Sequence, residues 1–195
     1  AQQVGPNVFQ GEKLRSIVGA LLVGAFLLSS CQGEAAEPKG APQTTAPANP
    51  DAKLPPMPAM ANEFTQSGAS AFVAHYVEVL EYASQTGDVA ELERLSRKNC
   101  EGCNRYIDLF VGIYEDGGFM KDHDWTIGGI KLLFQGTRGS ETMATTQLSI
   151  SGVEAKISRD EKLKKYGGSK DKVTFGVIFE DGWTVNQFAY GGTHK

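Results

Sequence analysis

The sequence predicts an α+β domain in which three N-terminal helices pack on a curved antiparallel sheet of about four strands. Apolar residues recur at helical spacing between positions 71 and 116, and they alternate with polar residues between positions 125 and 190. An Asp181-Gly182 pair between two alternating runs is typical of a tight hairpin turn. Because the helical runs precede the strands, we expect the helices to cover one face of an antiparallel sheet.

The three expected helices follow one another directly. The first covers residues 71–84, with Ser67 as N-cap and Gly87 just beyond its end. Asp88 opens a short second helix through an Asp version of the capping box. The third helix runs from Cys100 to Asp116 and ends before a Gly-Gly pair. Each helix carries an apolar stripe, so each is expected to face a common core.

The expected strands begin with residues 125–134. The alternation there changes phase at Gly128-Gly129, where a bulge would bend the strand. The second strand covers residues 144–150, the third covers 173–179 and the fourth covers 183–190. The bulge predicts that the sheet curves over the helices.

A charged, glycine-containing segment, residues 155–172, separates the second and third expected strands, and we interpret it as a long loop. Its basic residues outnumber its acidic residues by seven to three. The basic residues are Lys156, Arg159, Lys162, Lys164, Lys165, Lys170 and Lys172. Such an excess would attract anionic lipid, although the composition favours an ordinary solvated loop.

The N-terminal region has the features of an export signal. Lys13 and Arg15 precede twelve apolar residues, Ile17 to Leu28, a run too short to span a bilayer. The run leads into Leu28-Ser29-Ser30-Cys31, which resembles the bacterial lipobox. The resemblance implies that a diacylglyceryl group and fatty acids such as palmitate are attached at Cys31. It also implies cleavage before Cys31, which removes residues 1–30 as a lipoprotein signal peptide. The alternative is an ordinary secretory signal in which Cys31 has no role.

By this interpretation, residues 31–62 are the lipidated cysteine and a disordered tether. Residues 32–62 contain seven of the eight prolines of the chain and no aromatic residue, Val or Ile. Such a segment cannot bury enough apolar surface to fold, and it would extend by at most about 3.1 Å per residue. The folded domain is then expected to cover residues 63–195.

Two resemblances follow from these elements. The element order is similar to the nuclear-transport-factor-2-like cone fold, which implies a concave space between helices and sheet. The lipobox, the Pro-rich linker and several motifs of the domain are similar to a family of actinobacterial lipoproteins with a domain of unknown function. The matching positions are Ala71-Phe72-Val73, Tyr76, Tyr82-Ala83, Thr86-Gly87-Asp88, Leu95-Ser96, Cys100, Cys103, Tyr114 and Gly117-Gly118. This family implies a location in the cell envelope and brings no established activity.

The motif Cys100-Glu101-Gly102-Cys103 allows three interpretations. A structural disulfide that joins the second helix to the third is favoured, because export exposes thiols to oxidising conditions. A redox-active pair would benefit from the N-terminus of the third helix, which lowers a thiol pKa. Against this, a helical segment rather than a strand precedes the motif. Metal binding is least favoured, because two cysteines are half of a zinc site.

No catalytic, cofactor-binding or metal-binding residue is predicted. We expect His75 at the surface, at the edge of the apolar stripe of the first helix, and His123, in Asp122-His123-Asp124, in a solvated loop rather than a metal site. His194 lies next to the last residue. Tyrosines at 76, 82, 106 and 114 are expected to be core residues rather than oxyanion donors. The carboxylates Glu141, Glu154 and Glu180 lie at expected strand ends.

These observations predict a binding or scaffolding domain that is anchored to the extracytoplasmic face of the cell membrane through lipidated Cys31. The expected partner is an envelope protein or a small apolar ligand, and no cofactor is expected. Beyond Ala61, acidic residues outnumber basic residues, which argues against nucleic acid as a partner. The alternative is an enzyme, either an isomerase or hydrolase in a cone pocket or a thiol–disulfide exchanger that uses Cys100 and Cys103.

Overall fold

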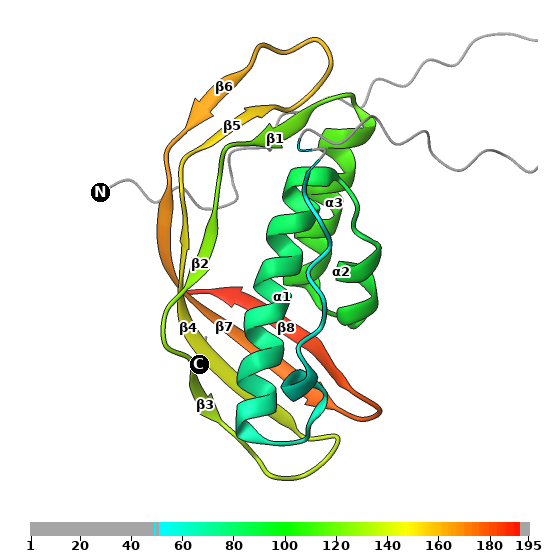
Figure 1. Cartoon of the computed structure of the whole chain (residues 1–195), viewed down its shortest axis with the longest axis vertical. Coiled ribbons are helices and arrows are strands. Elements are labelled where there is room, and N and C mark those ends of the chain that lie inside the picture. Colours follow the sequence, from blue (N-terminus) through cyan, green and yellow to red (C-terminus); the bar gives the residue numbers. More distant parts are fainter. Residues whose placement is uncertain (1–48, 50, 192–195) are drawn as a thin grey trace, which may run out of the picture. The chain divides into compact units, whose positions relative to one another are not determined.

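Helices and strands are segregated along the chain in the computed structural model, which describes Asn49 and residues 51–191. Residues 59–115 contain a short 3-10 helix and three α-helices: η2 (Ala59–Asn62), α1 (Gln66–Thr86), α2 (Ala90–Leu95) and α3 (Glu101–Glu115). The strands that follow are β1 (Phe119–Lys121), β2 (Trp125–Ile127), β3 (Lys131–Leu133), β4 (Glu141–Ile150), β5 (Val153–Lys156), β6 (Lys164–Tyr166), β7 (Ser169–Phe179) and β8 (Trp183–Tyr190). Figure 1 shows the helices lying along one side of the strands.

The strands form two antiparallel sheets. In the main sheet the order is β2-β4-β7-β8, and β3 pairs with β4 alongside β2. The smaller sheet has the order β1-β5-β6. Three connections, at residues 122–124, 151–152 and 167–168, lead from one sheet to the other, and we call this line the seam. At the seam the Ser151 amide donates to the Asp124 carbonyl oxygen (3.0 Å), and the Asp124 amide donates to the Ser151 hydroxyl oxygen (2.8 Å).

The predicted fold class is therefore wrong. Among the described residues, the helices occupy the middle of the chain rather than its N-terminus, and eight strands form two sheets of three and five strands rather than one curved sheet of about four. The expected loop at residues 155–172 instead contributes to β5, β6 and β7. Its lysines and glycines have low strand propensity. The strands form there because β5 pairs with β1 and β7 pairs with β4.

The predicted helices are present with small changes at their ends. The α1 N-cap is Thr65 rather than Ser67, because the Thr65 hydroxyl accepts from the Gly68 amide (2.9 Å). Gly87 ends α1 as expected, in the left-handed conformation (φ 76°). Asp88 accepts from the Ala90 amide (3.1 Å) and so supports the start of α2.

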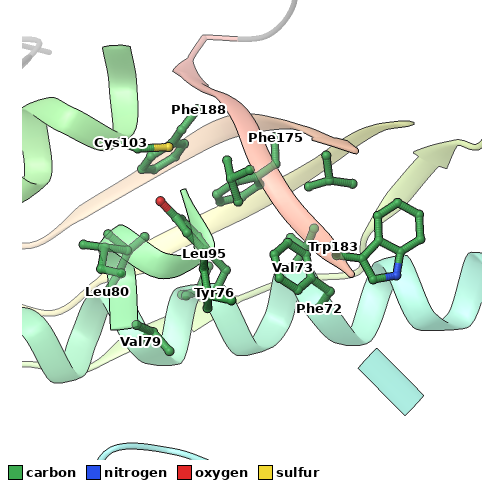
Figure 2. Close-up of a cluster of buried hydrophobic side chains, with 14 of the residues drawn as sticks. Phe72, Val73, Tyr76, Val79, Leu80, Leu95, Cys103, Phe175, Trp183 and Phe188 are labelled. Carbon is green, nitrogen blue, oxygen red and sulfur yellow. The ribbon is translucent and has the colours of Figure 1, made fainter. Parts of the chain in front are cut away.

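The core lies between the helices and the main sheet and is filled by large side chains. Figure 2 shows α1 contributing Phe72, Val73, Tyr76, Val79 and Leu80, which face Phe175, Trp183 and Phe188 from the sheet. Phe175 and Phe188 stack with ring centroids 4.7 Å apart. All of these side chains are at most 4% exposed. Among the described residues, no helix has the length and apolar character needed to cross a membrane.

Candidate functional site

His123 lies in the seam between β1 and β2, and its backbone turns the side chain inward. The preceding residue, Asp122, has φ 55°, and within the described residues it is the one non-glycine position with positive φ. Backbone strain of this kind is common at functional sites. The His123 side chain is 4% exposed, so the expectation of a solvated histidine is wrong.

A buried hydrogen bond joins His123 to the end of α1. The Ser84 hydroxyl and the His123 Nε2 are 2.6 Å apart, and the same hydroxyl donates to the Glu81 carbonyl oxygen (2.7 Å). Burial lowers the pKa of His123, partly offset by the Lys121 backbone, Asp124 and Asp122. The imidazole is therefore neutral at pH 7.

Tyr114 extends this connection to α3 and β1. Its hydroxyl donates to the Ser84 carbonyl oxygen (3.0 Å) and accepts from the Met120 amide (3.4 Å). Burial raises the pKa of Tyr114 to about 12. Ser84, His123 and Tyr114 thus bring α1, α3, β1 and the seam together.

A polar pocket of about 340 Å³ opens beside this cluster, lined by Asn49, Gln85, Lys121, Asp122, His123 and Asp124. The Gln85 amide donates to the Glu81 carboxylate (3.1 Å) and to the His123 carbonyl oxygen (3.3 Å). Burial raises the pKa of Glu81, and the Trp125 backbone opposes this shift. The pocket is small and polar, and within its lining the Asn49 amide donates to the Gln85 side-chain oxygen (3.0 Å) and Lys121 pairs with Asp122 (3.1 Å).

The Ser84–His123 pair has residue types found in hydrolase active sites, but it is buried where a substrate cannot reach it. A nucleophile must contact its substrate, and Ser84 is 0% exposed in the middle of the last turns of α1. No group of three or more His, Cys, Asp or Glu side chains in the described part of the chain could hold a metal ion. The hydrogen bonds of Ser84 with His123 and with Tyr114 instead hold α1, α3 and the seam together.

The predicted disulfide between Cys100 and Cys103 is confirmed. Cys100 is the N-cap of α3, and its sulfur accepts from the Cys103 amide (3.2 Å). Both cysteines are 0% exposed. Because thiol–disulfide exchange needs an attacking thiolate to reach a sulfur, this burial supports the structural interpretation over the redox one.

The other predicted residues do not converge on one site. The His75 side chain is buried (1% exposed) rather than at the surface edge of the apolar stripe of α1, and burial lowers its pKa. Tyr76 and Tyr106 are engaged, with Ser96 at 2.8 Å and with the Tyr190 hydroxyl respectively. Tyr82 donates to Asp88 (3.0 Å).

The three carboxylates at strand ends each have a surface partner. Glu141 accepts from Asn186 (2.8 Å), Glu154 pairs with Lys121 and Lys165, and Glu180 pairs with Arg97 (2.6 Å). None of them lies among the core side chains. Cys31 and His194 lie outside the described residues, so the lipidation prediction stays a prediction.

An open hollow on the outer face of the main sheet was not predicted. It has a volume of about 470 Å³ and is lined by Gly129, Lys131, Leu132, Leu133, Thr145, Thr146, Gln147 and Lys172. Leu133 is 68% exposed, the most exposed large apolar side chain of the described residues. The sequence contains the signal, because Ile130, Leu132 and Phe134 alternate, so that if they face the core Leu133 must point outward.

The model of a family of unknown function, DUF6318, matches residues 40–189, which is most of the chain. No curated protein matches the chain.

Proposed function

The chain belongs to this family of unknown function, and we propose that it is a lipid-anchored binding or scaffolding protein on the extracytoplasmic face of a bacterial cell membrane. One observation carries the anchor: a basic and apolar leader that ends in Leu28-Ser29-Ser30-Cys31. A single acyl chain binds a membrane only marginally, whereas two chains anchor it stably, at about 0.8 kcal/mol per buried methylene. A diacylglyceryl group on Cys31 would supply two acyl chains.

Binding at the surface is supported by the packing of the interior. Aromatic and aliphatic side chains fill the space between helices and main sheet, which leaves a small apolar ligand little room inside. The residues with the right chemistry for catalysis, Ser84 and the two disulfide cysteines, are 0% exposed. A protein partner is therefore the better candidate.

The hollow around Leu133 is the surface that best fits a protein partner. It combines an exposed apolar side chain with Lys131, Thr145 and Gln147, which offer a charge and hydrogen-bonding groups. Protein interfaces have this composition, with an apolar centre and a polar rim. The edge position of β3 leaves its outer backbone groups open to a further strand.

A crosslinking experiment on anchored protein in bacterial cells tests both parts of the proposal. We expect wild-type protein in the membrane fraction together with a crosslinked species of higher mass. Cys31→Ala should leave the membrane fraction. Leu133→Asp should stay there but lose the crosslinked species, because a buried charge at an interface centre costs binding energy.

Leu54→Asp is the matched control, because Leu54 is also exposed (45%) but lies outside the sheets. It should keep both the membrane location and the crosslinked species. If Cys31→Ala still fractionates with membranes, the anchor is refuted. If Leu133→Asp and Leu54→Asp crosslink equally, the hollow is not the binding surface.

A further inference from the structure

The hairpin formed by β5, β6 and the segment between them, residues 153–166, carries an unusual concentration of positive charge. We call it the basic hairpin. Residues 153–166 contain five basic and three acidic residues, a net charge of +2, while the whole chain has a net charge of −4. The rest of the chain therefore carries −6, so the basic hairpin is opposite in sign to the remainder of the protein.

Much of this charge has no partner. Lys164 pairs with Glu161 (2.8 Å), and Lys165 pairs with Glu154 (2.6 Å), which Lys121 also contacts (3.3 Å). Within residues 51–191, no acidic side chain forms an ion pair with Lys156, Arg159 or Lys162. A structural role would not require unpaired cations here.

The turn end of the basic hairpin also exposes an apolar side chain among its lysines. Leu163 is 46% exposed, and it lies between Lys162 and Lys164, both of which are exposed. In Figure 1 this end lies away from the main sheet, next to the C-terminal end of α3, whose C-cap Asp116 accepts from the Arg159 amide through its carbonyl oxygen (2.7 Å). An exposed apolar residue flanked by long basic side chains suits an interface between headgroups and acyl chains, because lysine stems extend along apolar surface while their charges remain in water.

We propose that the basic hairpin binds the anionic lipid surface of the membrane, with the unpaired side chains of Arg159 and Lys162 near the headgroups and Leu163 inserted beside them. The inference rests on the proposed anchor, because a tethered domain meets its membrane at high effective concentration. Charge complementarity selects anionic over zwitterionic lipid. Leu163 favours a lipid surface over an acidic protein, since it stands at a turn rather than in an apolar patch.

Vesicle co-sedimentation tests this inference without the anchor. The full chain with Cys31→Ser, which cannot be lipidated, is mixed with vesicles of phosphatidylglycerol and phosphatidylcholine or of phosphatidylcholine alone. We expect binding that rises with phosphatidylglycerol and weakens with salt. In this background, Arg159→Glu with Lys162→Glu should weaken binding about tenfold or more, because each basic residue near an anionic surface contributes roughly fivefold. Leu163→Ala should weaken it further.

Lys131→Glu with Lys172→Glu is the matched control, since it makes the same change in net charge on the exposed outer face of the main sheet. It should leave vesicle affinity within about twofold. Equal loss in the two double variants would overturn the inference, because it would indicate attraction by total charge alone. Binding without dependence on phosphatidylglycerol would also overturn it. Neither result bears on Cys31, whose role is judged from the membrane fraction of cells.

Discussion

At the residue scale, two buried histidines have lowered pKa values. His75 and His123 are 1% and 4% exposed. Burial lowers the pKa of both below the ordinary value of 6.5. For His75, Glu78 and Glu91 oppose this shift and Arg94 adds to it. The folded protein therefore holds both rings neutral under conditions where the unfolded chain would protonate them.

This difference predicts a loss of stability in mild acid. Because the folded pKa is depressed, the unfolded state binds more protons once the pH falls below about 6.5, so the free energy of unfolding decreases there. Each histidine contributes a slope of up to about 1.4 kcal/mol per pH unit. Urea unfolding at about pH 7.5 and about pH 5.5 measures the slope for wild-type protein and for His75→Leu.

The His75→Leu variant should have a shallower slope and little loss of stability at neutral pH. The only polar contact of the His75 ring among the described residues is a long one, 3.8 Å to the exposed carboxylate of Glu78. Leucine can occupy the site without leaving a buried polar group unpaired. If the variant and the wild type have the same slope, the buried ring of His75 is not the source of the pH dependence.

At the element scale, α3 depends on a close approach to β8. Gly102 lies in the first turn of α3, and a Cβ there would be 1.8 Å from the Phe188 carbonyl oxygen. Gly112 lies in the same helix, and nothing would lie within 4 Å of its Cβ. A side chain at position 102 would therefore clash with β8, whereas a side chain at position 112 would fit without contact.

We predict that Gly102→Ala destabilises the domain by several kcal/mol, since backbone must move to relieve the clash. Gly112→Ala should instead stabilise it by about 0.5–1 kcal/mol, because alanine has the higher helix propensity. Thermal unfolding followed by circular dichroism measures both. Similar melting temperatures for the two variants would contradict the close contact between α3 and Phe188.

The elements also show what local sequence can predict. The helices were predictable because their apolar stripes coincide with the faces they bury, and Gly87 ends α1 where expected. The strands β5 and β6 were not predictable from local sequence. Their residues Glu154, Lys164 and Lys165 are exposed or half-buried and show no apolar alternation. The pairing of β5 with β1 depends on contacts between residues more than 30 positions apart, which a local pattern does not contain.

At the scale of the whole molecule, the candidate site was the least predictable part. The Cys100–Cys103 disulfide was predictable from the spacing of the two cysteines and from the expectation of export. The Ser84–His123 hydrogen bond was not, because it joins α1 to the seam across 39 residues. The cone fold was wrong, since the strands divide at the seam into two sheets. We therefore expect different roles for the two parts of the chain. The N-terminal region is expected to anchor the protein to a membrane, and the packed domain is expected to bind a partner through its surface.

Mass spectrometry of the protein isolated from bacterial membranes tests the anchor most directly. We predict that the N-terminal peptide begins at Cys31 and carries the mass of a diacylglyceryl group with its fatty acids. A peptide in which Cys31 is unmodified and still joined to Ser30 would contradict the account.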